Sequence, residues 1–256
     1  MATFATERLS PNRIHDNHAF SREAFAKTRT NSGRWRRIRQ ITIELARRGY
    51  DVVLLDLVPE MLKLAKNKAK RTGAALKVKQ FVQGSIEDLS IFPDNTFDAL
   101  LCLGGPLSHL LKAEQRKNAA KELARVAKNG APIFVSVISR IGLLRTLLIR
   151  FQHEMQYAKH HWEVGNYILG QQGENFTATH WFLPEELQVL FEKQGGKILE
   201  MAGLEGLSSH HERETNRLYK NPVKWKMWLE ILLKTCTHPS VVGSTEHFLL
   251  VVQKQG

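Results

Sequence analysis

Short apolar runs alternate with amphipathic segments along most of this chain. The run at 52–55 is entirely apolar and ends at Asp56, which is typical of a buried strand. The segment before it, 41–49, carries apolar residues at helical spacing and ends in a glycine. The segment after it, 59–71, begins with a proline and again gathers apolar residues on one helical face. This order of helix, strand and helix predicts a β-α-β unit of a parallel sheet.

The second half of the chain contains two kinds of sequence. Strands are predicted at 132–138, 197–202 and 246–253, and a helix that begins with proline and ends with glycine is predicted at 184–195. Two other segments, at about 139–183 and 203–240, lack this alternation and are rich in His, Trp and Tyr. We expect these two segments to be cap elements over the carboxyl edge of the sheet, where open α/β sheets bind ligands.

Several motifs in this order resemble the class I S-adenosylmethionine-dependent methyltransferases, in the branch that acts on small molecules. Residues 83–98 are similar to the adenine loop of that family and to its following F-P-D-x-x-F-D turn. Residues 99–106 resemble the fourth strand and its loop, and 122–130 resemble the E-L-x-R-V-L-K-P-G-G helix and turn. The resemblance covers 41–137. It implies a Rossmann-like, doubly wound, seven-stranded α/β sheet, mostly parallel, with an antiparallel last strand beside the fifth.

The resemblance also implies a cofactor, S-adenosyl-L-methionine, and a set of residues that bind it. Asp56 stands where the family holds the two ribose hydroxyls, and Ser85 stands where an aspartate often binds the adenine amino group. The implied cofactor-binding residues are Asp56, Leu57, Gly84, Ser85, Ile86, Leu103 and Gly104. His109 follows the loop that faces the transferred methyl group in the family. His109 is a candidate general base, and a helix-capping or packing role for it is an equal alternative.

One motif of the family is missing from this sequence. The glycine-rich loop D-x-G-x-G-x-G should precede residue 41, where its backbone amides receive the methionine part of the cofactor. Residues 31–40 read Asn-Ser-Gly-Arg-Trp-Arg-Arg-Ile-Arg-Gln instead. Two lost amide bonds to a charged group predict a cofactor affinity lower by about 10² to 10⁴. The missing first strand further predicts that the strands near 52 and 99 lack their shared partner.

A frameshift is one hypothesis for this departure. Codons exist for 31–40 that spell I-L-D-A-G-G-G-S-G-R when read one nucleotide later, which restores the missing motif. Residues 1–40 hold nine Lys or Arg against three Asp or Glu, so half of the net charge of +12 lies in this atypical basic segment. The alternative is a native, divergent N-terminus ahead of a methyltransferase domain at 41–256. Sequencing the source gene distinguishes them, because an intact frame across these codons excludes the frameshift.

Composition and charge limit the other partners that the sequence could predict, namely nucleic acid, metal ions and membranes. A basic chain suggests nucleic acid, but half of the charge lies in 1–40, and the lysines of 63–79 fit a solvated helix face better. Two cysteines give neither a disulfide framework nor zinc spacing, and the histidines show no recognised metal-ligand pattern. No apolar run approaches the roughly 20 residues that cross a bilayer. With no secretory signal, we expect a cytoplasmic protein without a metal or membrane partner.

These observations favour S-adenosylmethionine-dependent methyl transfer to a small molecule. A nucleic-acid methyltransferase is one alternative, but the N/D-P-P-Y/F motif of amino-methylating members is absent, since 103–106 read Leu-Gly-Gly-Pro. A non-catalytic binding protein with a degenerate cofactor site is the other. The sequence does not predict the acceptor or the oligomeric state.

Overall fold

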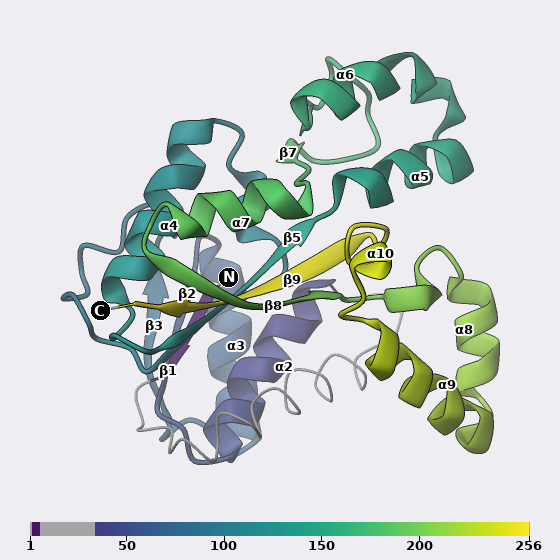
Figure 1. Ribbon diagram of the computed structural model, residues 1–256. Helices are drawn as coiled ribbons and strands as arrows, with labels where there is room; N and C mark the ends of the chain where they lie inside the picture. Colours follow the sequence, from purple (N-terminus) through teal and green to yellow (C-terminus); the bar gives the residue numbers. More distant parts are fainter. Residues whose placement is uncertain (1, 6–33, 256) are drawn as a thin grey trace.

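A seven-stranded sheet forms the centre of the computed structural model, which describes residues 2–5 and 34–255 (Figure 1). The strand order is β3-β2-β1-β4-β5-β9-β8. The strands are β1 (Ala2–Ala5), β2 (Val52–Asp56), β3 (Val78–Gln83), β4 (Ala99–Cys102), β5 (Pro132–Ile138), β8 (Gly196–Gly203) and β9 (His247–Lys254). The predicted fold class is confirmed: β9 runs antiparallel to β5, and the seven strands include parallel pairs on both sides of the centre.

Helices cover both faces of this sheet. Helices α2 (Arg34–Arg47) and α3 (Pro59–Arg71) lie on one face, and α4 (Ala113–Val126) and α7 (Pro184–Glu192) lie on the other (Figure 1). Each pair closes a separate apolar core. Ile41 and Ala69 belong to the core of the first face, while Leu123 and Phe191 belong to that of the second. A sheet with both faces covered explains why β2 and β5 are buried along their whole length.

The central place of the sheet is filled by the N-terminal strand. We expected β2 and β4 to lack a shared partner, and this expectation is wrong, because β1 pairs with both of them. The pairing is antiparallel, with Ala2 opposite Leu55 on one side and Cys102 on the other. The Thr3 hydroxyl lies 2.8 Å from that of Thr42, which joins the strand to α2. The amino end of β1 therefore lies at the carboxyl ends of its neighbours.

Helix α2 begins earlier than the sequence pattern predicts. It starts at Arg34 and runs without interruption past residue 40, where the sequence suggested a domain boundary. A short turn through Gly49, whose φ is +96°, leads from α2 into β2. The helix therefore returns antiparallel along the strand and begins near the carboxyl edge of the sheet. Residues 31–33, the start of the segment that replaces the glycine-rich loop, lie outside the described residues.

Two lobes extend from the sheet beyond the carboxyl end of β5 (Figure 1). The first lobe, 139–183, contains α5 (Arg140–Arg150), η2 (Gln152–Tyr157), α6 (Ala158–Val164) and the paired strands β6 (Asn166–Tyr167) and β7 (Thr179–His180). The second lobe, 203–240, contains η3 (Gly206–Ser208), α8 (Glu212–Tyr219), α9 (Pro222–Thr235) and the start of α10 (Pro239–Val242). In both segments, short helices replace the alternation of strands and helices that builds the main sheet.

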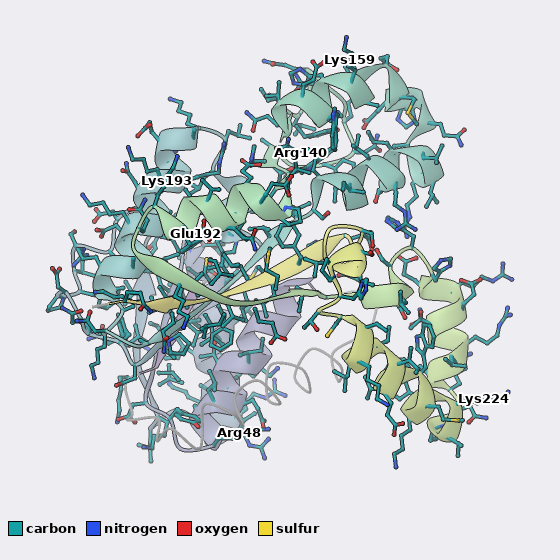
Figure 2. All side chains as sticks on the ribbon, in the orientation of Figure 1. Arg48, Arg140, Lys159, Glu192, Lys193 and Lys224 are labelled. Carbon is teal, nitrogen blue, oxygen red and sulfur yellow. The ribbon has the colours of Figure 1, made fainter. Side chains whose placement is uncertain are left out.

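A buried arginine attaches the first lobe to the body of the protein. Arg140, the first residue of α5, has only 8% of its side chain exposed. Its guanidinium donates to the carbonyls of Trp181 and Trp162 in the lobe, at 2.9 and 3.1 Å. It also donates to Glu186 of α7 at 2.8 Å. Figure 2 shows Arg140 at this junction. One side chain thus joins two segments of the lobe to a helix that covers the sheet.

Glu186 is the acidic centre of this junction. His180 Nε2 lies 2.6 Å from its carboxylate, and Arg116 of α4 lies 3.9 Å from it. Burial alone would raise the pKa of the Glu186 carboxyl, but the hydrogen bond from His180 and the charges of both arginines outweigh burial and lower that pKa. Burial lowers the pKa of His180. The carboxylate stays ionised and holds the two arginines.

The first prediction tests the antiparallel strand. Replacing Thr3 by proline removes a backbone donor from a central strand, where proline is not accommodated. We expect Thr3→Pro to lower the free energy of unfolding by about 2 to 4 kcal/mol in urea titrations. Thr3→Val is the matched control, because it loses only the hydroxyl contact with Thr42, about 1 kcal/mol. Equal effects of the two variants would show that β1 contributes little to the sheet.

A second prediction tests the attachment of the first lobe. A Cβ on Gly165 would lie 2.2 Å from Arg140 Nη2, and one on Gly170 would meet no atom within 4 Å. Both glycines have left-handed backbones, with φ of +76° and +80°. Gly170→Ala should therefore cost about 1 kcal/mol of stability, from backbone strain alone. Gly165→Ala should cost a further 1 to 3 kcal/mol. Denaturant unfolding measures both, and similar losses would contradict the role of Arg140.

Candidate functional site

Three loops meet at the carboxyl edge of neighbouring strands. They follow β2, β3 and β4 at 56–58, 84–86 and 103–109, and β1 is the strand between β2 and β4. Carboxyl ends of parallel strands form the ligand-binding edge of open α/β sheets. All the cofactor-binding residues expected from the sequence lie in these loops or at the ends of these strands. The structure therefore brings them to one edge.

Asp56 ends β2 with a buried carboxylate that is only half satisfied. The residue is 3% exposed, and its Oδ1 accepts a hydrogen bond from the Val58 amide at 2.9 Å. Its Oδ2 is buried and has no hydrogen-bond partner among the described residues. An unsatisfied buried acceptor costs about 1 to 3 kcal/mol. This oxygen fits a hydroxyl donor of a ligand, such as a ribose.

The loop after β3 is held beside Asp56 through the main chain. The Gly84 amide donates to the Asp56 carbonyl at 3.1 Å. Ser85 Oγ lies 3.4 Å from a carboxylate oxygen of Glu87. The Ile86 side chain is 4% exposed and packs in the core, so this residue presents its backbone rather than its side chain to the edge. Leu57, by contrast, exposes 63% of its surface and offers an apolar side chain to a planar ligand.

The loop after β4 has a fixed shape. Gly104 and Gly105 both have left-handed backbones, with φ of +84° and +82°. The Gly104 amide donates to Ser136 of β5 at 2.8 Å, and Ser108 accepts from the Ile138 amide at 3.0 Å. The Leu103 side chain is buried in the core of the α2 face. Two serine contacts to β5 thus hold the loop that follows β4.

His109 lies where this loop meets the first lobe. Its side chain is exposed, and Nδ1 lies 3.4 Å from the carbonyl oxygen of Ala178. A second contact runs nearby, because Asn166 donates to the Leu111 carbonyl at 3.4 Å. His180 Nδ1 in turn lies 2.6 Å from Asn166 Oδ1. The first lobe therefore contacts the β4 loop directly and is connected through His180 to the Arg140 junction.

The aromatic residues of the first lobe differ in their exposure. Trp181 and His161 are fully buried, with ring centroids 4.6 Å apart. Tyr167 stacks on Trp181 at 5.6 Å. These rings form the core of the lobe, and burial lowers the pKa of His161. Trp162 is 51% exposed and stays available to a ligand.

Two absences can be stated for the described part of the chain. Within it, no three His, Cys, Asp or Glu side chains are grouped so that they could hold a metal ion. Among the helices at 34–255, none has the length and apolar character that crossing a membrane requires.

Sequence reasoning missed the residues that fix the site in place. The sequence did not predict roles for Arg140 and Glu186, because a single arginine after a strand and a glutamate in the first turn of a helix are common surface features. Their burial depends on the fold of the lobe, which the sequence pattern did not predict. Ser136 gave one signal: it is the polar residue in an otherwise apolar predicted strand.

Comparison with known proteins gives a family match for part of the chain. Residues 40–130 match a family described as "Methyltransferase domain". A glycine/sarcosine N-methyltransferase of Parasynechococcus marenigrum is 33% identical over 92 residues, which is 34% of this chain. The match covers 30% of that relative, so the chain spans about a third of its length.

Solved structures agree on the fold. A S-adenosylmethionine-dependent methyltransferase of Methanosarcina mazei has a TM-score of 0.56 at 21% identity, over 84% of this chain and 86% of that one. A sarcosine dimethylglycine methyltransferase, so described from Galdieria sulphuraria, has a TM-score of 0.52 at 14% identity, over 95% and 86%. S-adenosylmethionine is the cofactor that this family implies, and Asp56 fits its ribose. Residues 40–130 thus match a methyltransferase domain, and the chain has the fold of S-adenosylmethionine-dependent methyltransferases.

Proposed function

We propose that this protein transfers a methyl group from S-adenosylmethionine to a small-molecule acceptor. The observation that carries the proposal is the Asp56 carboxylate, buried at the end of β2 with one oxygen that has no hydrogen-bond partner in the described part of the chain. A buried carboxylate oxygen without a hydrogen bond lowers stability. A ligand hydroxyl at Oδ2 would remove this cost, which explains why an acid is placed at this strand end.

The cofactor half of the site would use the three loops. Asp56 would accept hydrogen bonds from the ribose, and the exposed Leu57 would cover one face of the adenine. Backbone groups of 84–86 would border the same ring. The family's glycine-rich loop is absent, but α2 begins near the same edge, and the first turn of a helix carries amide donors without intrahelical partners and the positive end of the helix dipole. These donors would partly replace the missing loop.

The acceptor half would lie between the β4 loop and the first lobe. When bound, S-adenosylmethionine supplies an electrophilic methyl group on a sulfonium. The remaining task of the protein is to align the acceptor with this group and to exclude water. Ser136 and Ser108 hold the β4 loop still, and the first lobe covers it through His109 and Asn166. In this proposal His109 would remove a proton from the acceptor.

A small amine is the acceptor class to test first. One relative is described as a glycine/sarcosine N-methyltransferase, and a structure of similar fold is described as a sarcosine dimethylglycine methyltransferase. The experiment is to incubate the full chain with S-adenosylmethionine and a panel of small amines, carboxylic acids and phenols, and to follow S-adenosylhomocysteine release by mass spectrometry. Release that depends on one panel member supports the proposal. Release that requires RNA or DNA would favour a nucleic-acid methyltransferase instead.

A third prediction concerns the ribose contact. Asp56→Ala should weaken S-adenosylhomocysteine binding by about 1.5 to 3 kcal/mol per lost bond, roughly 10- to 150-fold, because a charged acceptor is removed. Asp51→Ala is the matched control, since Asp51 flanks the opposite end of β2 and pairs with Lys77 and Lys79. Isothermal titration calorimetry measures both. Equal affinities in the two variants would show that Asp56 only ends the strand and does not contact the cofactor.

A fourth prediction concerns His109. As a general base it should contribute about 10² to 10⁴ to kcat, so His109→Gln should lose that factor while binding S-adenosylhomocysteine normally. Asn166→Ala is the control, because it removes the other contact between the lobe and the β4 loop without removing a base. If both variants lose the same modest activity, His109 only positions the lobe.

A further inference from the structure

Helix α9 of the second lobe is apolar in sequence but has no buried residue. One side of it packs on the protein: Trp228 donates to Ser208 of η3 at 2.9 Å, and Trp225 lies 5.2 Å from the Tyr219 ring of α8. The opposite side faces outward. A helix that only filled a gap in the lobe would bury its large side chains, so the outward side needs another explanation.

The outward side carries an apolar stripe. Val223, Met227 and Ile231 follow one another at four-residue intervals, so they lie along one face of the helix. They are 71%, 65% and 43% exposed. Exposed hydrophobic residues scattered singly are ordinary, whereas three in a row on one helix mark an interaction surface.

Lysines flank this stripe. Helical spacing places Lys224 on one side of it, Lys226 on the other, and Lys234 at its end, and all three are exposed. Figure 2 shows Lys224 at the outer end of the lobe, away from the sheet. Glu230, the one acid of the helix, is also exposed, and helical spacing places it beside the stripe on the side of Lys226. The face is therefore an apolar stripe bordered by three lysines and one glutamate.

We propose that the outer face of α9 binds the surface of an anionic lipid membrane. An interfacial helix buries an apolar stripe at the boundary between headgroups and acyl chains, and its lysines bind anionic headgroups through flexible stems. The stripe and the lysine border of α9 match both parts of such a surface. This mode of binding lies in the plane of the membrane, so it needs no helix able to cross one.

Other occupants fit this face less well. A second copy of the chain joined across a two-fold axis would bring the lysine borders of both copies together, and like charges repel. A stable protein partner usually covers about 800 Å² on each side, much more than three side chains of one helix provide. A projecting helix with a narrow stripe suits insertion into a soft, charged surface better than docking on a rigid one.

The test is sedimentation of the full chain with vesicles. Wild-type protein should bind vesicles of phosphatidylcholine and phosphatidylserine at 3:1, and binding to phosphatidylcholine alone should be at least about tenfold weaker. The triple variant Lys224→Glu, Lys226→Glu, Lys234→Glu should bind the mixed vesicles about 100-fold more weakly. A triple variant Val223→Gln, Met227→Gln, Ile231→Gln should lose binding at least about tenfold at all salt concentrations.

Matched controls separate this helix from general surface effects. Lys63, Lys66 and Lys70 are exposed on α3, so their change to Glu alters the net charge equally elsewhere and should leave most of the binding. Leu76→Gln, Ile91→Gln and Val189→Gln together replace exposed apolar side chains outside α9 and should leave binding unchanged. Circular dichroism melting confirms that each variant is folded.

Three results would overturn the proposal. The first is equal binding of the wild-type chain to both vesicle types, or none to either. The second is binding that survives both α9 variants. The third is a dimer in sedimentation velocity that the Val223, Met227, Ile231 variant dissociates, because this face would then join two copies.

Discussion

The pairing of β1 between β2 and β4 completes the centre of the sheet and positions the strands that carry the candidate site. Without it, two buried strands would have unpaired backbone groups along the centre of the sheet, which is costly in an apolar core. Four residues at the start of the chain satisfy both strands at once. The ends of β2 and β4 that carry Asp56 and the Gly104 turn are thereby held in one plane. The geometry of the candidate site follows from this pairing.

Most of the fold could be predicted from the sequence. Apolar runs such as 52–55 and 132–138 are buried strands, because a sheet covered on both faces requires continuous apolar sequence. The antiparallel β9 followed from the resemblance. The direction of β1 could not be predicted, since four residues give no periodic signal. Its pairing depends on the absence of the family's first strand, which leaves a free position in the sheet between β2 and β4. If 31–40 were replaced by I-L-D-A-G-G-G-S-G-R, a parallel strand would compete for the same place.

Part of the candidate site could be predicted because the apolar runs also indicate where strands end. Asp56 and the loops after β3 and β4 lie at strand ends, and strand ends can be read from sequence. The attachment of the first lobe depends on a buried arginine whose partners come from three separate segments, at Trp162, Trp181 and Glu186. Such long-range contacts leave no local pattern. The same holds for the outward side of α9, because a helical apolar stripe usually indicates a core.

We propose that Asp56, at the end of a strand supported by the antiparallel β1, holds the cofactor's ribose. A crystal structure of the full chain grown with S-adenosylhomocysteine tests this most directly. We expect ribose hydroxyls within hydrogen-bonding distance of Asp56 Oδ2, with residues 2–5 still paired between β2 and β4. A nucleoside bound away from Asp56, or a parallel strand from another segment in the central place, would contradict it.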